Sequence, residues 1–283
     1  MSVKIIADST CDLSKDLLEK YDISILPLHI VLGEQEYKDG LEITPDEIYA
    51  WSDANKEAPK TSAVSISDAV EIFEEHLKDH DEIVCFSISS QMSTTINVMR
   101  MAADELEKED KIFIIDSENL STGGGLLVLE AALKAREGLS GSEIKEYIEQ
   151  VRPKVRASFI VDTLTYLHRG GRCSGVAALA GGALKLHPKI MVENGAMKPD
   201  KKYRGKMSSA ILTYVKELEP QMKCAKTDRV FLTHSGCDES IIQSVYSYLE
   251  ELHIFDEILV SRAGGVISSH CGPGTLGVLF IEN

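Results

Sequence analysis

The sequence predicts an α/β protein of two domains, and three observations support this prediction. Short apolar segments rich in β-branched residues alternate with helical patterns of about ten residues through the first 155 residues. This alternation is typical of βαβ units with a mostly parallel sheet. In the second half, the Asn-Gly pair at 194–195 separates two strand-like segments and predicts an antiparallel hairpin. The length of 283 residues is enough for two ordinary domains.

The elements of residues 1–155 follow from apolar periodicity and from residues that start helices. We expect strands at 3–7, 23–32, 82–88 and 111–116, and helices at 14–21, from 44, from 65 to about 78, at about 94–108, at 123–138 and from 140. The helix from 44 has the strongest start, because Thr44 can cap it, Pro45 suits its first position and Glu47 completes a capping box. These elements indicate a mostly parallel α/β/α N-terminal domain.

Residues 156–283 are expected to form a C-terminal α/β domain with a mixed sheet. The hairpin at 189–199 is followed by a helix, a strand at 229–235, a helix, a strand at 257–261 and a last strand at 275–282. Gly272, Gly274 and Gly277 match G-x-G-x-x-G, but a dinucleotide-binding loop needs a following helix in a βαβ unit. Only six residues follow Gly277, so these glycines predict a tight turn before the last strand.

Composition excludes several classes of function. The net charge of −15 argues against general binding of nucleic acid. Six cysteines without a C-x-x-C pair suggest neither a zinc site nor a disulfide framework, and no P-loop motif for ATP occurs. The N-terminus does not resemble a signal peptide, and no apolar run approaches a membrane span. We therefore expect a cytoplasmic protein without a cofactor.

Charge is unevenly distributed along the chain. Between Tyr166 and Met207, nine basic residues face only Glu193 and Asp200, so this window carries +7 and the remainder −22. The basic residues are Arg169, Arg172, Lys185, Lys189, Lys198, Lys201, Lys202, Arg204 and Lys206. A basic window in an acidic protein indicates a surface for an acidic partner or an anionic membrane.

Three segments carry candidate binding residues. The segment 87–97 joins a buried strand to a helix and includes Ser93 and Thr94 among five hydroxyl residues, where a helix N-terminus favours an anion. Thr61 and Ser62 precede a helix that Ser65 already caps. His270 lies among small residues, which suits a backbone that faces a ligand.

These residues leave three functions open. Hydroxyl groups with one histidine can hold a carboxylate without a fixed buried cation. Ser93 and His270 could instead act as nucleophile and base in a hydrolase or acyltransferase, although G-x-S-x-G is absent. The helix N-terminus could also serve a regulatory module that binds a small anion such as phosphate.

The whole chain resembles the DegV family, which includes the fatty-acid-binding subunits of bacterial fatty acid kinase. The resemblance rests on IIADSTCDL (5–13), Thr61-Ser62, SSQMSTT (89–95), DTLTYLHRGGR (162–172), KYRGKMSSA (202–210) and SSHCGPGTLG (268–277). It implies a DegV-like fold of two α/β domains that enclose a long-chain fatty acid. The residues that the resemblance implies for binding of the fatty-acid carboxylate are Thr61, Ser62, Ser93, Thr94 and His270.

The resemblance also implies that the protein is not itself an enzyme. A separate fatty acid kinase catalytic subunit would phosphorylate the bound acid, in agreement with the absence of an ATP motif. Arg169, Arg172, Lys202 and Arg204 would then contact the kinase or, transiently, an anionic membrane.

Overall fold

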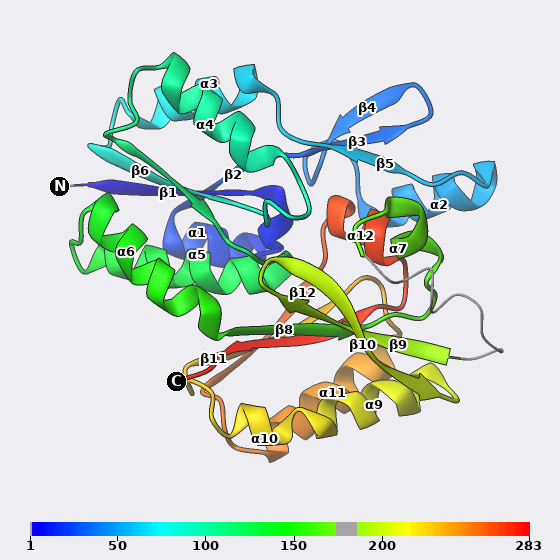
Figure 1. Cartoon of the computed structure of the whole chain (residues 1–283). Helices are drawn as coiled ribbons and strands as arrows, with labels where there is room; N and C mark the ends of the chain where they lie inside the picture. The colour runs from blue at the N-terminus through cyan, green and yellow to red at the C-terminus, as the bar shows by residue number, and fades with distance from the viewer. Residues whose placement is uncertain (1, 174–185) are drawn as a thin grey trace.

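The computed structural model describes residues 2–173 and 186–283 and contains three sheets in these ranges (Figure 1). The first is a parallel sheet in the order β2-β1-β6-β7. Its strands are β1 (Val3–Asp8), β2 (Ile23–Leu26), β6 (Glu82–Ser87) and β7 (Ile112–Asp116). All four were predicted as strands, because each is a short apolar run that becomes buried on both faces.

Helices cover both faces of this parallel sheet, which confirms the α/β/α prediction (Figure 1). One face carries α3 (Ile66–His76) and α4 (Thr95–Glu105), and the other carries α1 (Lys15–Tyr21), α5 (Ser121–Arg136) and α6 (Gly141–Val151). The predicted capping box forms at Thr44, before α2 (Pro45–Asn55), and a second capping box forms at Ser140, before α6. Two 3-10 turns, η1 (Ser9–Cys11) and η2 (Arg152–Lys154), follow β1 and α6.

Residues from 155 onward build a six-stranded mixed sheet in the order β10-β9-β8-β13-β11-β12. Its strands are β8 (Val155–Ile160), β9 (Leu186–Glu193), β10 (Ala196–Arg204), β11 (Arg229–His234), β12 (Glu257–Arg262) and β13 (Leu276–Ile281). On its outer face lie α9 (Met207–Glu217), α10 (Glu219–Met222) and α11 (Glu239–Glu251) (Figure 1). The fold class is therefore the predicted one. The domain boundary at 155/156, which falls at the start of β8, stays a prediction.

The helix α5 lies between the two large sheets. Seven consecutive residues, 126–132, are almost fully buried, so this helix has no solvent-facing stripe in its centre. One cluster of buried side chains joins Leu127 and Ala131 of α5 to Phe231 and Leu279 of the six-stranded sheet. The two halves of the chain thus share a hydrophobic core.

The predicted hairpin is confirmed. Strands β9 and β10 pair in antiparallel register around Asn194 and Gly195, whose φ angles are 50° and 76°. A two-residue hairpin turn that matches the twist of its strands requires two successive residues with positive φ angles. The hydroxyl of Ser89 donates to the carbonyl of Gly195 at 2.6 Å, so the hairpin turn rests on the N-terminal half.

The segment 23–32 differs from its prediction as a single strand. It forms two strands in different sheets, β2 and β3 (His29–Leu32), with Pro27 between them. Proline has no N–H to donate, so the ladder stops there and the chain turns away. Strand β3 joins a small antiparallel sheet with β4 (Gln35–Lys38) and β5 (Lys60–Ser62), which was not predicted.

The end of the chain confirms the predicted turn and adds a helix. Gly272 and Gly274 have positive φ angles and lead into β13, which lies between β8 and β11. The unpredicted helix α12 (Gly265–Cys271) precedes this turn and packs against α7 (Thr165–Gly170), also unpredicted. No helix in the described part of the chain combines the length and apolar character needed to cross a membrane.

Candidate functional site

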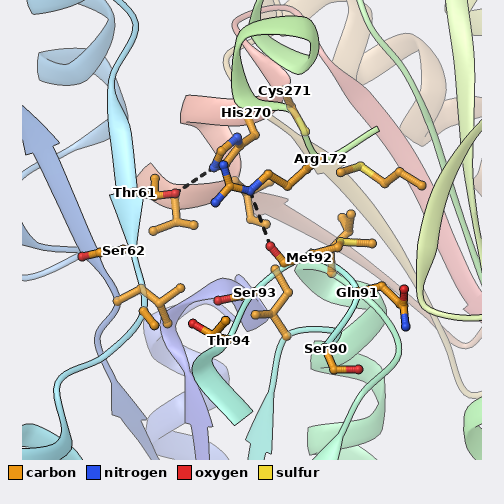
Figure 2. Close-up of a pocket in the computed structure, with 17 residues that line it drawn as sticks. Thr61, Ser62, Ser90, Gln91, Met92, Ser93, Thr94, Arg172, His270 and Cys271 are labelled. Carbon is orange, nitrogen blue, oxygen red and sulfur yellow. Dashed lines mark hydrogen bonds between the residues drawn. The ribbon is translucent and has the colours of Figure 1, made fainter. Parts of the chain in front are cut away.

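A cavity of about 490 Å³ lies where both halves of the chain meet (Figure 2). Its walls come from β5, from the connection between β6 and α4, from α12 and from the segment after α7. All five predicted binding residues, Thr61, Ser62, Ser93, Thr94 and His270, line this cavity. Tertiary structure therefore brings together residues that lie up to 209 positions apart in the chain.

Thr61 and His270 form the link across the cavity. The Oγ1 of Thr61 and the Nε2 of His270 are 2.8 Å apart, which is a hydrogen bond between the two halves of the chain. His270 lies in the last turn of α12, not in the open loop that its small neighbours suggested. Burial, followed by the nearby charge of Arg172, lowers the pKa of His270 to about 4. The imidazole is therefore neutral at pH 7.

The Nδ1 edge of the His270 ring lies next to Gly170. A Cβ atom at Gly170 would lie 2.2 Å from His270 Nδ1, so only glycine fits this close approach. The Nδ1 atom is buried and has no hydrogen-bond partner among the described residues. Gly170, the first glycine of the RGGR motif, therefore lies directly beside the histidine ring.

Ser93 and Thr94 lie at the N-terminus of α4. The Oγ of Ser93 is 2.8 Å from the Oγ1 of Thr95 and accepts the Thr95 backbone N–H at 3.2 Å. Thr94 is the N-cap of α4, and its side chain makes no capping hydrogen bond. The hydroxyls of Ser93 and Thr94 and the positive end of the helix dipole therefore occur at the cavity wall.

Ser62 differs from Thr61 in orientation, although both line the cavity. Neighbouring side chains on a strand alternate in direction. Thr61 points at His270, whereas Ser62 points away from it (Figure 2) and its hydroxyl donates to Glu36 at 3.4 Å. Thr61 is consequently the stronger candidate for contact with a ligand.

Arg172 lies at the cavity wall, although the sequence placed it with the residues of a partner surface. Its guanidinium donates to the carbonyl of Gly170 at 2.7 Å. It also donates to the carbonyl of Met92, another residue of the cavity wall, at 3.5 Å (Figure 2). The basic window therefore has at least one residue at the cavity wall. Charge alone gave no signal for this placement.

The other three predicted surface residues lie outside the cavity. Arg169 is exposed on α7, and Lys202 and Arg204 are exposed on β10. Within 2–173 and 186–283 none of the three has a carboxylate within 4 Å. Other cations of the window are paired, Lys189 with Asp200, Lys198 with Glu193 and Lys201 with Glu217. Lys185 lies outside the described residues.

The rest of the cavity wall is apolar, and the sequence did not reveal which residues form it. Its main members are Leu28, Ile88, Met92, Leu120, Met197, Val266 and Ile267. They come from five separate segments, so no local pattern could have identified them. The cavity therefore has one polar end with hydroxyls, a neutral histidine and a cation, and a larger apolar remainder.

This geometry does not provide a catalytic triad in the described part of the chain. The nearest polar partner of Ser93 is Thr95, and the partner of His270 is Thr61. No carboxylate bonds to His270 Nδ1, whereas a triad needs one there to orient the base. The arrangement fits recognition of an amphipathic anion better than nucleophilic chemistry.

Fold and cavity thus define an α/β ligand-binding protein whose site lies between the two halves of the chain. A family model described as DegV family matches residues 2–283, and this chain belongs to the DegV family. A DegV domain-containing protein of Caldanaerobacter subterraneus is 33% identical over 282 residues, which are 99% of each chain.

Two solved structures show the same fold over the whole chain. One, described as fatty acid binding of a DegV family protein from Thermus thermophilus, has a TM-score of 0.91 and 30% identity and covers 100% of both chains. The other, described as a stearic acid-binding protein from Eubacterium ventriosum, has a TM-score of 0.85 and 29% identity and covers 99% of this chain and 98% of that one.

Proposed function

We propose that this protein binds one long-chain fatty acid, with its carboxylate at the polar end of the cavity and its acyl chain along the apolar wall. The observation that carries the proposal is the convergence of Thr61, Ser93, Arg172 and His270 at that end. These four residues are called the carboxylate clamp below. The solved relatives described as binding fatty acid and stearic acid support the same ligand class.

The clamp suits a carboxylate in its charge and donors. Arg172 supplies the positive charge, and hydroxyl groups donate without the cost of a second buried cation. The neutral imidazole of His270 can donate a hydrogen bond through one ring nitrogen while it accepts one through the other. A fatty-acid carboxylate could take over the hydrogen bonds that Thr61 and His270 now make to each other. Both side chains already lie next to each other for this purpose.

The apolar wall supplies most of the affinity. Burial of about fourteen methylenes at ~0.8 kcal/mol each gives roughly 11 kcal/mol of transfer free energy. Association and ordering of the chain consume several kcal/mol of this sum. The clamp then determines which end of the ligand lies near Arg172, and the chain determines how tightly the ligand is held.

We further propose that the protein presents the bound acid to a separate fatty acid kinase and catalyses nothing itself. Arg169, Lys202 and Arg204 are exposed cations without a carboxylate partner in the described ranges, which suits contact with an acidic kinase surface or an anionic membrane. The carrier would need no cofactor and would act in the cytoplasm.

The first test is the identity of what the purified protein carries. Organic extraction and mass spectrometry should detect a C14–C20 fatty acid, because an apolar cavity with a polar clamp retains its ligand in water. The delipidated protein should bind oleate again. A protein that purifies empty and binds no acid of this length would exclude the carrier function.

The second test concerns the clamp. Ser93→Ala and His270→Ala should each weaken oleate binding by fivefold or more, because a hydrogen bond to a charged acceptor contributes about 1.5–3 kcal/mol. Ser62→Ala is the matched control, since Ser62 points away from His270. If both clamp variants bind oleate as the parent does, the carboxylate lies elsewhere.

A further inference from the structure

The segment 8–12, between β1 and α1, lies behind the cavity. Its residues do not line the cavity, yet its polar side chains hold the backbone of segments that form the cavity walls. Asp8, Asp12 and the neighbouring Asp39 are 2%, 6% and 2% exposed. Three buried carboxylates in one place are costly to desolvate, so the bonds that they accept define their role.

Asp8 holds the segment that carries Ser93. Its Oδ2 accepts the backbone N–H of Ile88 at 2.7 Å, and its Oδ1 accepts the N–H and the hydroxyl of Thr10. Ile88 is the first residue after β6 and itself lines the cavity. Asp8 therefore fixes the start of the connection that leads to Ser93.

Ser9 and Asp39 hold the segment that leads to Thr61. The Oγ of Ser9 accepts the N–H of Leu28 at 3.1 Å and donates to Asp39 Oδ2 at 2.8 Å. The N–H of Asp39 donates to the carbonyl of Leu28 at 2.8 Å. Leu28 directly precedes β3, and β3 pairs with the strand β5 that carries Thr61.

Asp12 and Asp39 together hold the start of α12, which carries His270. The Oδ1 of Asp12 accepts the N–H of Gly264, and the Oδ1 of Asp39 accepts the N–H of Gly265, both at 2.8 Å. A Cβ atom at Gly265 would lie 2.7 Å from Asp39 Oδ1, so the helix can approach this closely only with glycine there. His270 follows five residues later.

We propose that Asp8, Ser9, Asp12 and Asp39 are positioning residues that set the spacing of Thr61, Ser93 and His270 in the carboxylate clamp. Asp8 and Ser9 are adjacent in the chain and Ser9 bonds to Asp39, so the hydrogen bonds to the three segments start from one place. A change in one bond should displace one clamp residue relative to the others. The choice of a fatty acid as the ligand rests on the proposed function. The arrangement of His270 does not depend on it.

Asp39 offers the sharpest variants. Asp12 has a φ of 51°, where alanine would add backbone strain, whereas Asp39 is not among the positive-φ residues. Asp39→Ala removes both acceptors. Asp39→Asn keeps an oxygen for the Gly265 N–H and presents an amide to the Ser9 hydroxyl, which can accept a hydrogen bond.

The control is a buried carboxylate that does not touch the cavity. Glu130 of α5 is 3% exposed and pairs with Lys226 at 2.8 Å. Glu130→Gln should lower the melting temperature without a change in oleate affinity. Asp39→Ala should raise the Kd for oleate at least tenfold, and Asp39→Asn should stay within about threefold of the parent.

A measurement without ligand distinguishes an effect on the position of His270 from an effect on stability. It also does not depend on the proposed function. In the delipidated parent, ¹⁵N NMR should show His270 neutral well below pH 6.5. In Asp39→Ala its pKa should move toward 6.5, because the ring no longer packs in place against Thr61 and Gly170. Asp39→Asn should restore the parental titration, and Glu130→Gln should leave it unchanged.

Two results would overturn the inference. One is an Asp39→Ala protein with the parental oleate Kd and His270 titration. The other is an equal change in Glu130→Gln, which would make stability the cause. If Asp39→Ala does not fold, Ser9→Ala is tested in its place. A parental oleate Kd and a parental His270 titration in Ser9→Ala would then contradict the inference. A parent that binds no oleate would refute the proposed function, while the His270 titration still decides the positioning.

Discussion

His270 combines burial, one hydrogen bond and a neighbouring cation, and its burial and the cation lower its pKa. Burial disfavours the charged imidazolium, and Arg172 adds repulsion, so the pKa in the folded protein is about 4. The hydrogen bond to Thr61 is available to the neutral ring through either tautomer. A neutral histidine next to an arginine suits a site that must accept an anion and release it again.

Stability should fall in mild acid because of this residue. The pKa of His270 is lower in the folded protein than in the unfolded chain, about 4 against 6.5. The stabilising contribution of the neutral ring is therefore complete above pH 6.5 and is lost as the pH falls from 6.5 to 4. The measurement is the unfolding free energy of the ligand-free parent and of His270→Gln from pH 7 to pH 4.

The comparison of the two proteins isolates His270 from other groups. Asp8 has a folded-state pKa raised to about 6 by burial, so its contribution changes in the opposite direction over the same range. His270→Gln retains Asp8 and should lose less stability than the parent as the pH falls. A pH dependence that is identical in both proteins would contradict the low pKa.

Gly170→Ala should weaken oleate binding by tenfold or more while the fold is retained. The added methyl group would lie 2.2 Å from His270 Nδ1, so the ring must move away from Thr61. Gly171→Ala is not a suitable control, because Gly171 has a φ of 66°. Calorimetric titration with oleate measures the effect, and unchanged affinity would show that the ring has room to move.

At the scale of elements, a strand, a connection and a helix position the clamp. Thr61 lies on β5, Ser93 lies between β6 and α4, and His270 lies in the last turn of α12. In open α/β sheets the carboxyl ends of parallel strands are the usual position for a ligand, and the β6–α4 connection follows this rule. The hairpin β9–β10 completes the enclosure with Met197.

The hairpin turn should be sensitive to substitution because it meets the N-terminal half. Gly195 has a φ of 76°, and a Cβ atom there would lie 2.7 Å from Ser89 Oγ. Gly195→Ala should destabilise the protein by about 1–2 kcal/mol from backbone conformation alone, and the contact adds to this cost. Denaturant unfolding measures the change. Gly138→Ala is a matched control, since Gly138 has a φ of 90° with no atom near its Cβ position.

At the scale of the whole molecule, the two halves share a core and a cavity but divide the charge between them. The window from Tyr166 to Met207 is +7 in a chain of −15. Three of its predicted surface cations, Arg169, Lys202 and Arg204, are exposed outside the cavity, whereas Arg172 lines it. If the protein binds and delivers a fatty acid as proposed, variants of these three cations should affect delivery without an effect on binding.

A charge reversal at Lys202 and Arg204 should impair delivery and spare binding. The Lys202→Glu, Arg204→Glu double variant should retain fatty acid by mass spectrometry, because neither residue lines the cavity. Formation of acyl phosphate with a fatty acid kinase, or lipid exchange with anionic vesicles, should fall by tenfold or more, and added salt should slow the parent. Parental delivery rates would mean that these cations only face solvent.

Arg172→Ala tests the opposite assignment. Because its guanidinium lines the cavity and its charge acts on His270, its loss should weaken oleate binding by tenfold or more. Arg169→Ala, three residues away and outside the cavity, is the matched control and should bind oleate as the parent does. If Arg172→Ala keeps its fatty acid and loses only delivery, the residue belongs to the partner surface as the sequence suggested.

Most regular elements could be predicted from the sequence because their signals are local. The capping boxes at Thr44 and Ser140, the apolar runs of β1 and β6 and the Asn-Gly turn each act within a few residues. The missed elements have short or ambiguous patterns. Strand β5 has three residues and α12 has seven, and both become regular only when packed against distant segments.

The sequence by itself determined the α/β class, the hydroxyl and histidine residues of the candidate site and the basic window, because residue type and local periodicity carry that information. The structure was needed to show that Arg172 lines the cavity, that Ser62 turns away from His270 and that the buried Asp39 bonds to the start of α12. The physical reason is that orientation depends on contacts between segments far apart in the chain. Thr61 and His270 are 209 positions apart, and the hydrogen bond between them forms only when both halves fold together.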